Sequence, residues 1–168
     1  MTFISLGSNL GDREQHLRSA LRALRRIGIV HRISSFYETD PVGDIAQPDF
    51  LNAVVELHTP LGPKELLSAL LQIEQENGRD RRFSPPKGPR TLDLDLLSHG
   101  STVMKTPTLT LPHPAIADRS FVLVPLAEIA PEWRHPLSGK TAAQLLSAFQ
   151  TSDPASSVRK LSTSPQSP

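Results

Sequence analysis

The chain has 168 residues and carries 18 lysines and arginines against 17 aspartates and glutamates, so its net charge is +1. One domain is expected at this size, since ~150 residues per domain is the working prior, and the balanced charge argues against a general binder of polyanions. The absence of cysteine excludes disulfides, thiolate catalysis and cysteine-ligated metal sites. The N-terminus lacks the signature of a signal peptide, and the longest mostly apolar stretch, residues 121–130, is too short to cross a membrane. We therefore expect a cytoplasmic protein with no membrane or nucleic-acid partner.

Hydrophobic periodicity predicts most elements in chain order. Alternation predicts strands, and leucines at helical spacing, such as Leu17, Leu21 and Leu24, predict helices. The predicted order is a strand at 2–6, a helix ending near 28, strands at 31–38 and 50–57, a helix at 63–78, a strand at 91–97, a short strand at 108–111, and helices at 121–129 and 141–149. The first six elements form a βαββαβ pattern, which predicts a ferredoxin-like α+β fold with an antiparallel sheet and both helices on one face. The later strand and helices are additions to that core.

Domain organisation follows from composition. Residues 1–150 contain all the predicted elements, whereas residues 151–168 hold eight serines and threonines and three prolines. Such a segment buries too little apolar surface to order itself. The sequence therefore predicts one domain at 1–150 and a disordered tail whose deletion would leave stability and activity nearly unchanged.

The face of the predicted sheet that lies away from the two helices displays Ser5, Phe50, Asn52, Asp93 and Asp95. Asp93 and Asp95 lie two positions apart on one strand, so their carboxylates point to the same side. Unpaired, they would repel each other, and aspartate also has a low strand propensity. Carboxylates suit Mg²⁺, which is usually held by one or two of them together with substrate phosphates. A solvent-facing acidic strand is the alternative.

A basic loop leads directly into this strand. Residues 79–90 hold five basic residues and one acid. Arginine side chains match phosphate oxygens bidentately, and anion binders beside metal ligands are the components of phosphoryl transfer. Taken alone, the loop could equally be a solvated surface.

A histidine between two prolines is the third feature. Pro112 and Pro114 fix the backbone of His113, and Arg119 follows shortly after. Together, His113 and Arg119 could donate hydrogen bonds to a transferring phosphate. The sequence has no G-x-x-x-x-G-K-[ST] loop, no G-x-G-x-x-G fingerprint and no H-E-x-x-H, so the common nucleotide and zinc-protease motifs are excluded.

Several blocks together resemble one enzyme family, 6-hydroxymethyl-7,8-dihydropterin pyrophosphokinase. The resemblance covers residues 2 to about 146. The blocks are SLGSNLG at 5–11, SSFYET at 34–39 with PVG at 41–43, QPDFLN at 47–52, GPRTLDLD at 88–95, and LPH at 111–113 with Arg119 and Phe121. The GPRTLDLD block is very specific to this family.

The resemblance implies transfer of the β,γ-diphosphate of ATP to the pterin hydroxymethyl oxygen, with release of AMP, in folate biosynthesis. It implies two Mg²⁺ ions on Asp93 and Asp95, and ATP as co-substrate. The catalytic residues that it implies are Arg81, Arg90, Asp93 and Asp95. The implied ATP-binding residues are Glu74, Arg81, Arg90, Leu96, Thr110, His113 and Arg119. The implied pterin-binding residues are Thr39, Pro41, Val42, Gly43, Phe50, Asn52, Asp93 and Phe121.

The chain departs from the family pattern in four places. An Arg-Trp pair that often precedes Gly-Pro-Arg is replaced by residues 85–87, Pro-Pro-Lys. Phe50 stands for a tyrosine of some members, Pro114 for another tyrosine, and Thr108 for an arginine that contacts adenosine. We expect the chemistry to survive and the ATP affinity to differ.

Two functions of other classes stay open on the residues alone. A ferredoxin-like RNA-binding module would need exposed aromatic residues on its central strands, for which only Phe3 and Phe50 qualify. A regulatory small-molecule-binding domain would need no aspartate pair beside an arginine loop. We expect a monomer that acts on ATP and the pterin.

Overall fold

The computed structural model describes residues 1–41, 46–79, 88–153 and 158–162. Its elements, in chain order, are β1 (Thr2–Ser8), α1 (Arg13–Leu24), β2 (Ile29–Ile33), β3 (Tyr37–Thr39), β4 (Phe50–His58), α2 (Pro63–Glu76), β5 (Asp93–His99), β6 (Met104–Lys105), β7 (Thr110–Leu111), α3 (Ser120–Ile129), α4 (Ala142–Ser152) and β8 (Val158–Lys160). The helix starts carry expected signals: the side chain of Asp12 caps α1 by accepting from Gln15 N at 3.0 Å, and Pro63 opens α2.

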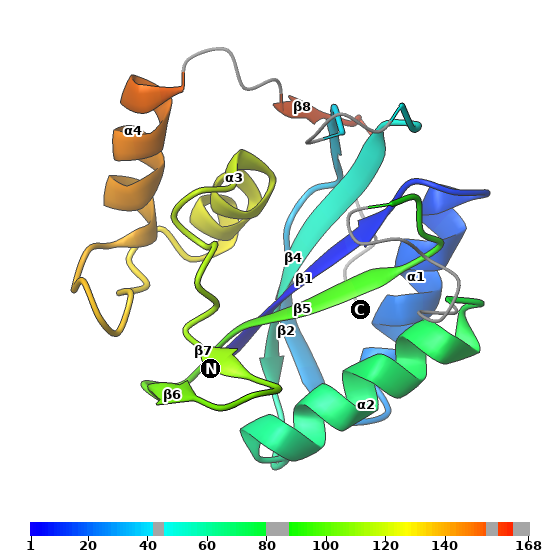
Figure 1. The fold of residues 1–168 in the computed structure, drawn as a ribbon, viewed down its shortest axis with the longest axis horizontal. Coiled ribbons are helices and arrows are strands. Elements are labelled where there is room, and N and C mark those ends of the chain that lie inside the picture. The colour runs from blue at the N-terminus through cyan, green and yellow to red at the C-terminus, as the bar shows by residue number, and fades with distance from the viewer. Residues whose placement is uncertain (42–45, 80–87, 154–157, 163–168) are drawn as a thin grey trace.

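The main sheet is antiparallel, in the order β5-β1-β4-β3-β8, with β2 pairing with β4 beside β3. Helices α1 and α2 cover one face of the sheet, and α3 and α4 lie on the other side (Figure 1). This arrangement confirms the predicted ferredoxin-like α+β fold and places the added C-terminal helices on the face opposite α1 and α2. β1 is buried along its whole length because it lies between β5 and β4.

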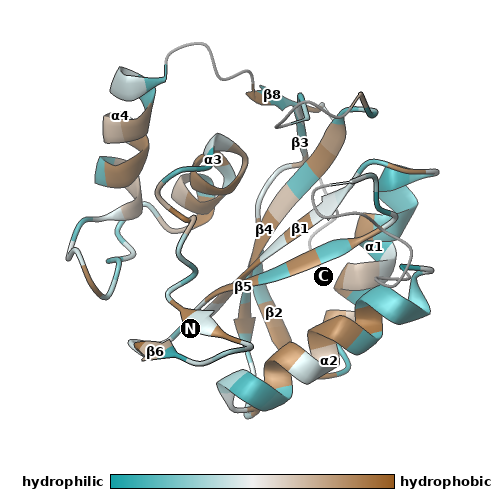
Figure 2. Ribbon diagram, viewed as in Figure 1, coloured by the Kyte–Doolittle hydropathy of each residue, from teal (hydrophilic) through white to brown (hydrophobic). Residues whose placement is uncertain are grey.

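Two apolar clusters hold the layers together. The larger one joins α1 and α2 to the even-numbered residues of β1, including Ile4 and Leu6. The smaller one joins Phe3 and Val54 of the opposite face to α3 and α4. Brown, apolar stretches on α2 and on the strands mark parts of the chain that contribute to these clusters (Figure 2). Because α3 and α4 cover part of that second face, only its remaining part can form an open site.

One predicted strand, residues 31–38, is divided in two. Ser34 N donates to Val54 O at 2.9 Å, and Val54 N donates to the hydroxyl of Ser34 instead of to a backbone carbonyl, also at 2.9 Å. The side chain thus takes the place of a backbone acceptor in the ladder. β2 ends at Ile33 and β3 begins at Tyr37 for this reason.

The tail differs from its predicted disorder in the residues that are described. α4 extends to Ser152, and β8 pairs with β3. Leu161 N donates to Phe36 O at 2.9 Å, and its side chain packs against the larger cluster. The prediction of disorder rests on the small apolar surface of the tail. The outer edge of β3 adds backbone hydrogen bonds that composition does not reveal.

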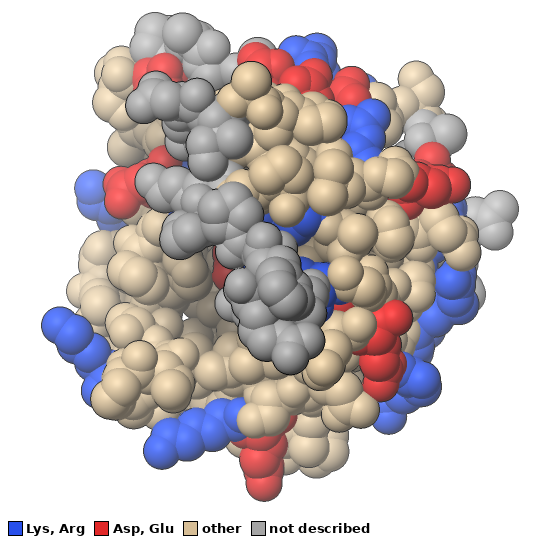
Figure 3. All heavy atoms as spheres, turned by 45° about the vertical axis from the view of Figure 1, so that its right-hand side comes forward, with Lys and Arg blue, Asp and Glu red and all other residues tan. Residues whose placement is uncertain are grey.

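Charged side chains of both signs are interspersed over the described part of the face in Figure 3. The residues with large exposed apolar side chains are scattered over the chain rather than neighbours on one element: Met1, Leu10, Ile29, Leu71, Val103 and Leu137. Within the described residues, no helix combines the length and the apolar character that a membrane crossing requires.

The single tyrosine gives a direct test of the packing between β3 and α3. Burial, together with the charge and hydrogen bond of Glu128, raises the pKa of Tyr37 to about 12. We expect tyrosinate absorbance to appear with a midpoint near that pH, and Glu128→Gln to lower the midpoint. Since the unfolded chain loses this proton near pH 10 and the folded chain keeps it, stability should fall as the pH rises from there to the folded pKa. A native midpoint near that of free tyrosine would contradict the packing.

Candidate active site

A row of facing residues crosses three strands at one end of the sheet. Gly7 of β1 lies opposite Asp93 of β5 on one side and Asn52 of β4 on the other. Directly opposed residues point to the same face, so Asp93 and Asn52 flank the glycine. A Cβ at Gly7 would lie 3.1 Å from Asn52 Oδ1 and 3.9 Å from both Asp93 Cβ and Phe50 Cδ1. A side chain at this position would therefore crowd the amide of Asn52, so glycine allows an amide, a carboxylate and an aromatic ring to lie close together here.

Asp93 lies beside Gly7 and Asp95 lies opposite Ser5, and both aspartates are paired with arginines. Asp93 accepts from Arg79 and from Arg90, with Nη1 of Arg90 at 2.7 Å from Oδ2. Asp95, one row further along, has Arg119 Nη1 at 3.4 Å from its Oδ2. The two aspartates lie two positions apart on β5 and so share one face of the strand, whereas their convergence on a cation stays a prediction. Each of these arginines could also take phosphate oxygens as partners.

Burial raises the pKa of Asp95, and the negative charge of Asp93 raises it further. The positive charges of His113, Arg119 and Arg90 oppose this rise. The surrounding protein groups therefore stabilise the negative charge of Asp95 only in part. A cation placed between Asp93 and Asp95 would remove the repulsion, which is the behaviour expected of a metal ligand.

His113 faces this carboxylate pair. Burial lowers its pKa, and Arg119 lowers it further, although the charges of Asp95 and Asp93 act in the opposite direction. Its Nδ1 accepts from Ala115 N at 3.1 Å. In the neutral ring the proton therefore sits on Nε2, which makes His113 a hydrogen-bond donor toward the site.

Two half-buried aromatic rings each carry an arginine. The guanidinium of Arg90 lies over the ring of Phe50, 5.6 Å from its centroid, and that of Arg119 lies over Phe121 at 5.5 Å. Phe50 begins β4, and Phe121 lies in the first turn of α3. The family resemblance implies that both rings bind the pterin, and this role stays a prediction. The structure links each ring through its arginine to one of the two aspartates.

The amide of Asn52 is oriented by its neighbour on β3. Its Nδ2 donates to Thr39 Oγ1 at 2.7 Å, and both side chains are buried. Its Oδ1 is the atom that a Cβ at Gly7 would approach. Asn52 thus directs an acceptor toward Gly7, suited to an N–H group on the edge of a flat ring.

Other predicted ATP-binding residues lie along β5 and near it. Glu74 is 1% exposed and accepts from Leu94 N and from Arg79, both at 2.8 Å. It thus supports the strand and the arginine, and its contact with a ribose stays a prediction. Leu96 is buried in the larger cluster, but it lies two residues beyond Leu94 and presents its backbone to the same outer edge of β5. Thr110 is half-buried on the short strand β7.

Three predicted residues lie outside the described part of the chain: Val42, Gly43 and Arg81. Of their neighbours, Pro41 is half-buried. Nothing in the structure bears on the predicted roles of these three.

Sequence reasoning gave no role to Gly7, Arg79 or Asn9. A glycine inside a strand commonly marks the close approach of a ligand, and this signal at Gly7 could have been used. In the sequence, Arg79 is one of the five basic residues in the basic loop. In the structure, its Nη1 contacts Glu74, Asp93 and Leu92 O. These contacts depend on where the chain turns after α2, which periodicity does not specify.

Asn9 makes hydrogen bonds to two separate segments of the site. Its backbone N donates to Arg90 O at 3.1 Å, and its Oδ1 accepts from Arg90 N at 2.8 Å. Its Nδ2 donates to Gln47 Oε1 at 2.9 Å and to Pro48 O at 3.0 Å. The side chain is 1% exposed. Asn9 therefore fixes Arg90 relative to the segment that leads into Phe50.

Removing this amide should affect both stability and turnover. We expect Asn9→Ala to cost about 1–3 kcal/mol of unfolding free energy, because buried hydrogen-bonding groups lose their partners. We also expect kcat/KM to fall by about 10-fold or more, since Arg90 and Phe50 lose their common support. Asn9→Asp keeps the acceptor for Arg90 N and tests the Pro48 side alone. Chemical unfolding and steady-state kinetics measure both effects; an Asn9→Ala variant equal to wild type in both would refute the role.

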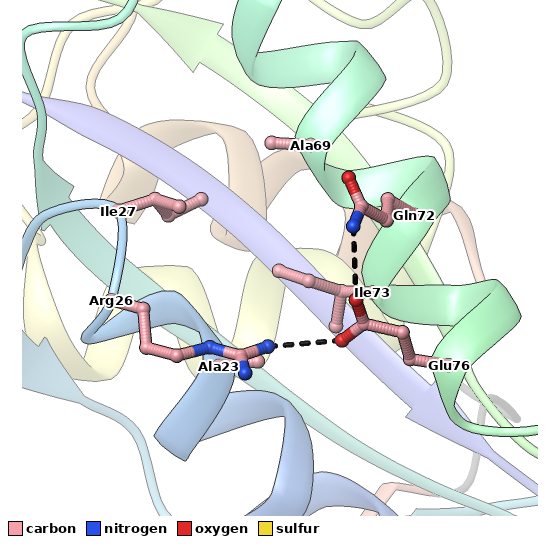
Figure 4. A pocket seen from close by; sticks show the side chains of 7 residues that line it. All are labelled: Ala23, Arg26, Ile27, Ala69, Gln72, Ile73 and Glu76. Carbon is pink, nitrogen blue, oxygen red and sulfur yellow. Dashed lines mark hydrogen bonds and ion pairs between the residues drawn. The ribbon is translucent and has the colours of Figure 1, made fainter.

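A cavity elsewhere in the structure does not serve this site. About 230 Å³ of space lies between α1 and α2, on the opposite side of the sheet (Figure 4). Its three polar side chains contact one another: Arg26 Nη2 donates to Glu76 at 2.9 Å, and Gln72 Nε2 donates to Glu76 at 3.0 Å. None of the predicted site residues lines this cavity.

Comparison with known proteins identifies the family. A profile described as 7,8-dihydro-6-hydroxymethylpterin-pyrophosphokinase matches residues 3–131. The chain belongs to this pyrophosphokinase family. A protein of Synechocystis named 2-amino-4-hydroxy-6-hydroxymethyldihydropteridine pyrophosphokinase is 48% identical over 145 residues, which are 85% of this chain and 73% of that protein. A Bacillus subtilis protein of the same name is 49% identical over 131 residues, or 77% of each chain.

Pyrophosphokinase domains of this kind also occur within longer proteins. A mitochondrial folate synthesis bifunctional protein of Arabidopsis thaliana is 48% identical over 127 residues, which are 75% of this chain and 23% of that protein. The fold is shared with a crystal structure of wild-type Plasmodium falciparum HPPK-DHPS with pterin and p-hydroxybenzoate, at a TM-score of 0.72 and 16% identity, covering 91% of this chain and 43% of that one. The family membership confirms the predicted resemblance and the predicted class of enzyme.

The RNA-binding alternative is not supported by the structure. It required exposed aromatic residues on the central strands, but Phe3 is fully buried and packs edge-on against Trp133, with ring centroids 5.8 Å apart. Phe50 remains, beside the aspartates that would repel a nucleic acid.

Proposed function

We propose that this pyrophosphokinase transfers the diphosphate of ATP to the pterin hydroxymethyl group beside the row formed by Asp93, Gly7 and Asn52. The row that joins Asp93 to Asn52 carries this proposal, because one end suits cations and phosphates and the other suits a flat polar ring. In this arrangement Phe50 and Phe121 stack on the two faces of the pterin. The acceptor of Asn52 reads its edge, with Thr39 holding the amide in place.

We assign the phosphate side to the cationic groups around the aspartates. Arg90, Arg119 and the Nε2–H of His113 would bind the transferring phosphates, and Arg81 would join them from the loop outside the described residues. Arg90 and Arg119 both lie beside a carboxylate and over an aromatic ring. Each could therefore position a phosphate relative to the ring that it covers, which brings the β-phosphorus and the pterin alcohol together.

The residues present fit a pair of divalent cations. Asp93 and Asp95 supply oxygen ligands on one face, and among the described residues no group of three or more histidine, aspartate or glutamate side chains is placed to hold a metal. Phosphate oxygens of ATP would thus complete the coordination, as is usual for Mg²⁺. When bound, Mg²⁺ would neutralise the triphosphate and acidify the attacking alcohol.

An assay of the products tests this function. Purified protein with ATP, Mg²⁺ and 6-hydroxymethyl-7,8-dihydropterin should release AMP and the pterin diphosphate in equal amounts. Omission of the pterin or of Mg²⁺ should abolish AMP release. Formation of ADP and phosphate, or AMP release without the pterin, would overturn the proposal.

The proposed enzyme is a cytoplasmic monomer. The large exposed apolar side chains of the described residues come from separate segments of the chain. The absence of cysteine is compatible with a reducing compartment. Sedimentation equilibrium should give a mass near 18.4 kDa, and a concentration-dependent dimer would contradict the monomer.

A further inference from the structure

We propose that Arg159, on the tail strand β8, is a positioning residue for the pterin side of the site. Its guanidinium bridges the two ends of the segment that joins β3 to β4 and thereby holds Phe50 in place. The inference rests on the proposed function of Phe50 as a pterin-stacking ring. The family profile matches residues 3–131, so the tail lies beyond the region that carries the resemblance.

The backbone of β8 brings Arg159 to this place. β8 runs antiparallel along the outer edge of β3, with Val158 opposite Thr39 and Arg159 opposite Glu38. Thr39 in turn accepts from the amide of Asn52. The tail strand therefore covers the outside of the short strand that orients the pterin-reading amide.

The side chain of Arg159 then contacts both ends of the connecting segment. Its Nη1 donates to Asp40 Oδ1 at 3.3 Å, and its Nη2 donates to Asp49 Oδ2 at 3.0 Å. Asp40 directly follows β3, and Asp49 directly precedes Phe50. One planar guanidinium thus fixes the spacing between the exit of β3 and the entry of β4, which a single-nitrogen lysine cannot do equally well.

A second arginine, at the start of α1, also connects the end of β3 to the residue before β4. Arg13 Nη1 donates to Asp49 O at 2.9 Å, and its Nη2 lies 2.7 Å from Glu38 Oε1. The acids Glu38, Asp40 and Asp49 would repel one another without these cations. Asp49 is thus held through its carbonyl by Arg13 and through its carboxylate by Arg159, immediately before the stacking ring.

This contact should affect positioning more than global stability. The side chains of Arg159, Asp40 and Asp49 are 49%, 61% and 41% exposed. Ion pairs this exposed contribute little to the free energy of unfolding. A small displacement of a substrate-orienting group, in contrast, is expressed directly in substrate binding and turnover.

Steady-state kinetics of Arg159→Ala in the full chain test the proposal. We expect the KM for the pterin to rise by about 5- to 10-fold, with the KM for ATP and the melting temperature nearly unchanged. Arg159→Lys should recover only part of the loss. The matched control is Lys160→Ala, which removes the neighbouring cation of β8, paired with Glu128 at 2.9 Å on the side of α3. It should leave the pterin KM within about two-fold of wild type.

Hydrogen exchange gives a readout that needs no turnover. Backbone amides of residues 46–50 should exchange faster in Arg159→Ala than in wild type or Lys160→Ala. Unchanged exchange and an unchanged pterin KM in Arg159→Ala would overturn the proposal, and so would an equal effect of Lys160→Ala, which would indicate general docking of the tail. Loss of the proposed function would appear differently, as wild-type protein without pterin-dependent AMP release, and the exchange comparison would still decide the role of Arg159 in holding this segment.

Discussion

Replacing either aspartate of the pair by asparagine should lower kcat by at least about 10²-fold, because the carboxylates would hold the cations that neutralise the phosphates. The substitution keeps the side-chain shape and removes one charge. Asp95→Asn should also leave the melting temperature equal to or above that of wild type, since burial and Asp93 both disfavour the charged form of Asp95. Thermal unfolding and AMP release with saturating ATP and Mg²⁺ measure the two effects.

Asp12→Asn is the matched control for these variants. Asp12 is exposed and caps α1, and asparagine caps a helix about as well as aspartate does. Its turnover and stability should stay close to wild type. If Asp93→Asn and Asp95→Asn both retained turnover within a few-fold of Asp12→Asn, the carboxylates would not be metal ligands in the reaction.

Arg90→Ala should have the second large effect. Arg90 contacts Asp93 through Nη1 and covers the ring of Phe50, so its loss removes a phosphate donor and loosens the stacking ring. We expect kcat/KM to fall by about 10²- to 10³-fold, as for the loss of one preorganised donor aimed at developing charge. Binding of AMP should weaken much less, because AMP lacks the transferred phosphates.

Two further variants sharpen this prediction. Arg90→Lys should recover only a minor part of the activity, since lysine has neither the bidentate geometry nor the planar surface of arginine. Arg26→Ala removes an exposed arginine on the opposite side of the sheet, where it pairs with Glu76, and should leave kinetics unchanged. Equal losses of AMP affinity and of kcat/KM in Arg90→Ala would show that the residue binds nucleotide without favouring transfer.

The predictable part of this fold is the part governed by periodicity. Alternation along 50–57 and leucine spacing along 17–24 reflect burial against one layer, so β4 and α1 could be predicted from local sequence. The division between β2 and β3 could not, because it depends on the hydroxyl of Ser34 bonding to Val54, 20 residues away. The strand β8 was missed for a similar reason, since its partner β3 is distant in the chain.

The same distinction applies to the site. The aspartate pair was predictable because two positions on one strand fix a shared face. Family resemblance supplied Phe50, Phe121 and Asn52. A glycine inside a strand was a usable signal for Gly7, whereas the role of Asn9 depends on contacts across 38 to 81 positions of sequence, which only the folded chain reveals.

The most direct measurement of the central claim is the number of cations held at the aspartate pair. Mn²⁺, in place of Mg²⁺, can be titrated by electron paramagnetic resonance into the protein saturated with a non-hydrolysable ATP analogue. Wild-type protein should bind two ions per chain, and Asp93→Asn and Asp95→Asn should each bind fewer or bind them far more weakly, whereas Asp12→Asn should match wild type. Two tightly bound ions in every variant would contradict the assignment of Asp93 and Asp95 as the metal site.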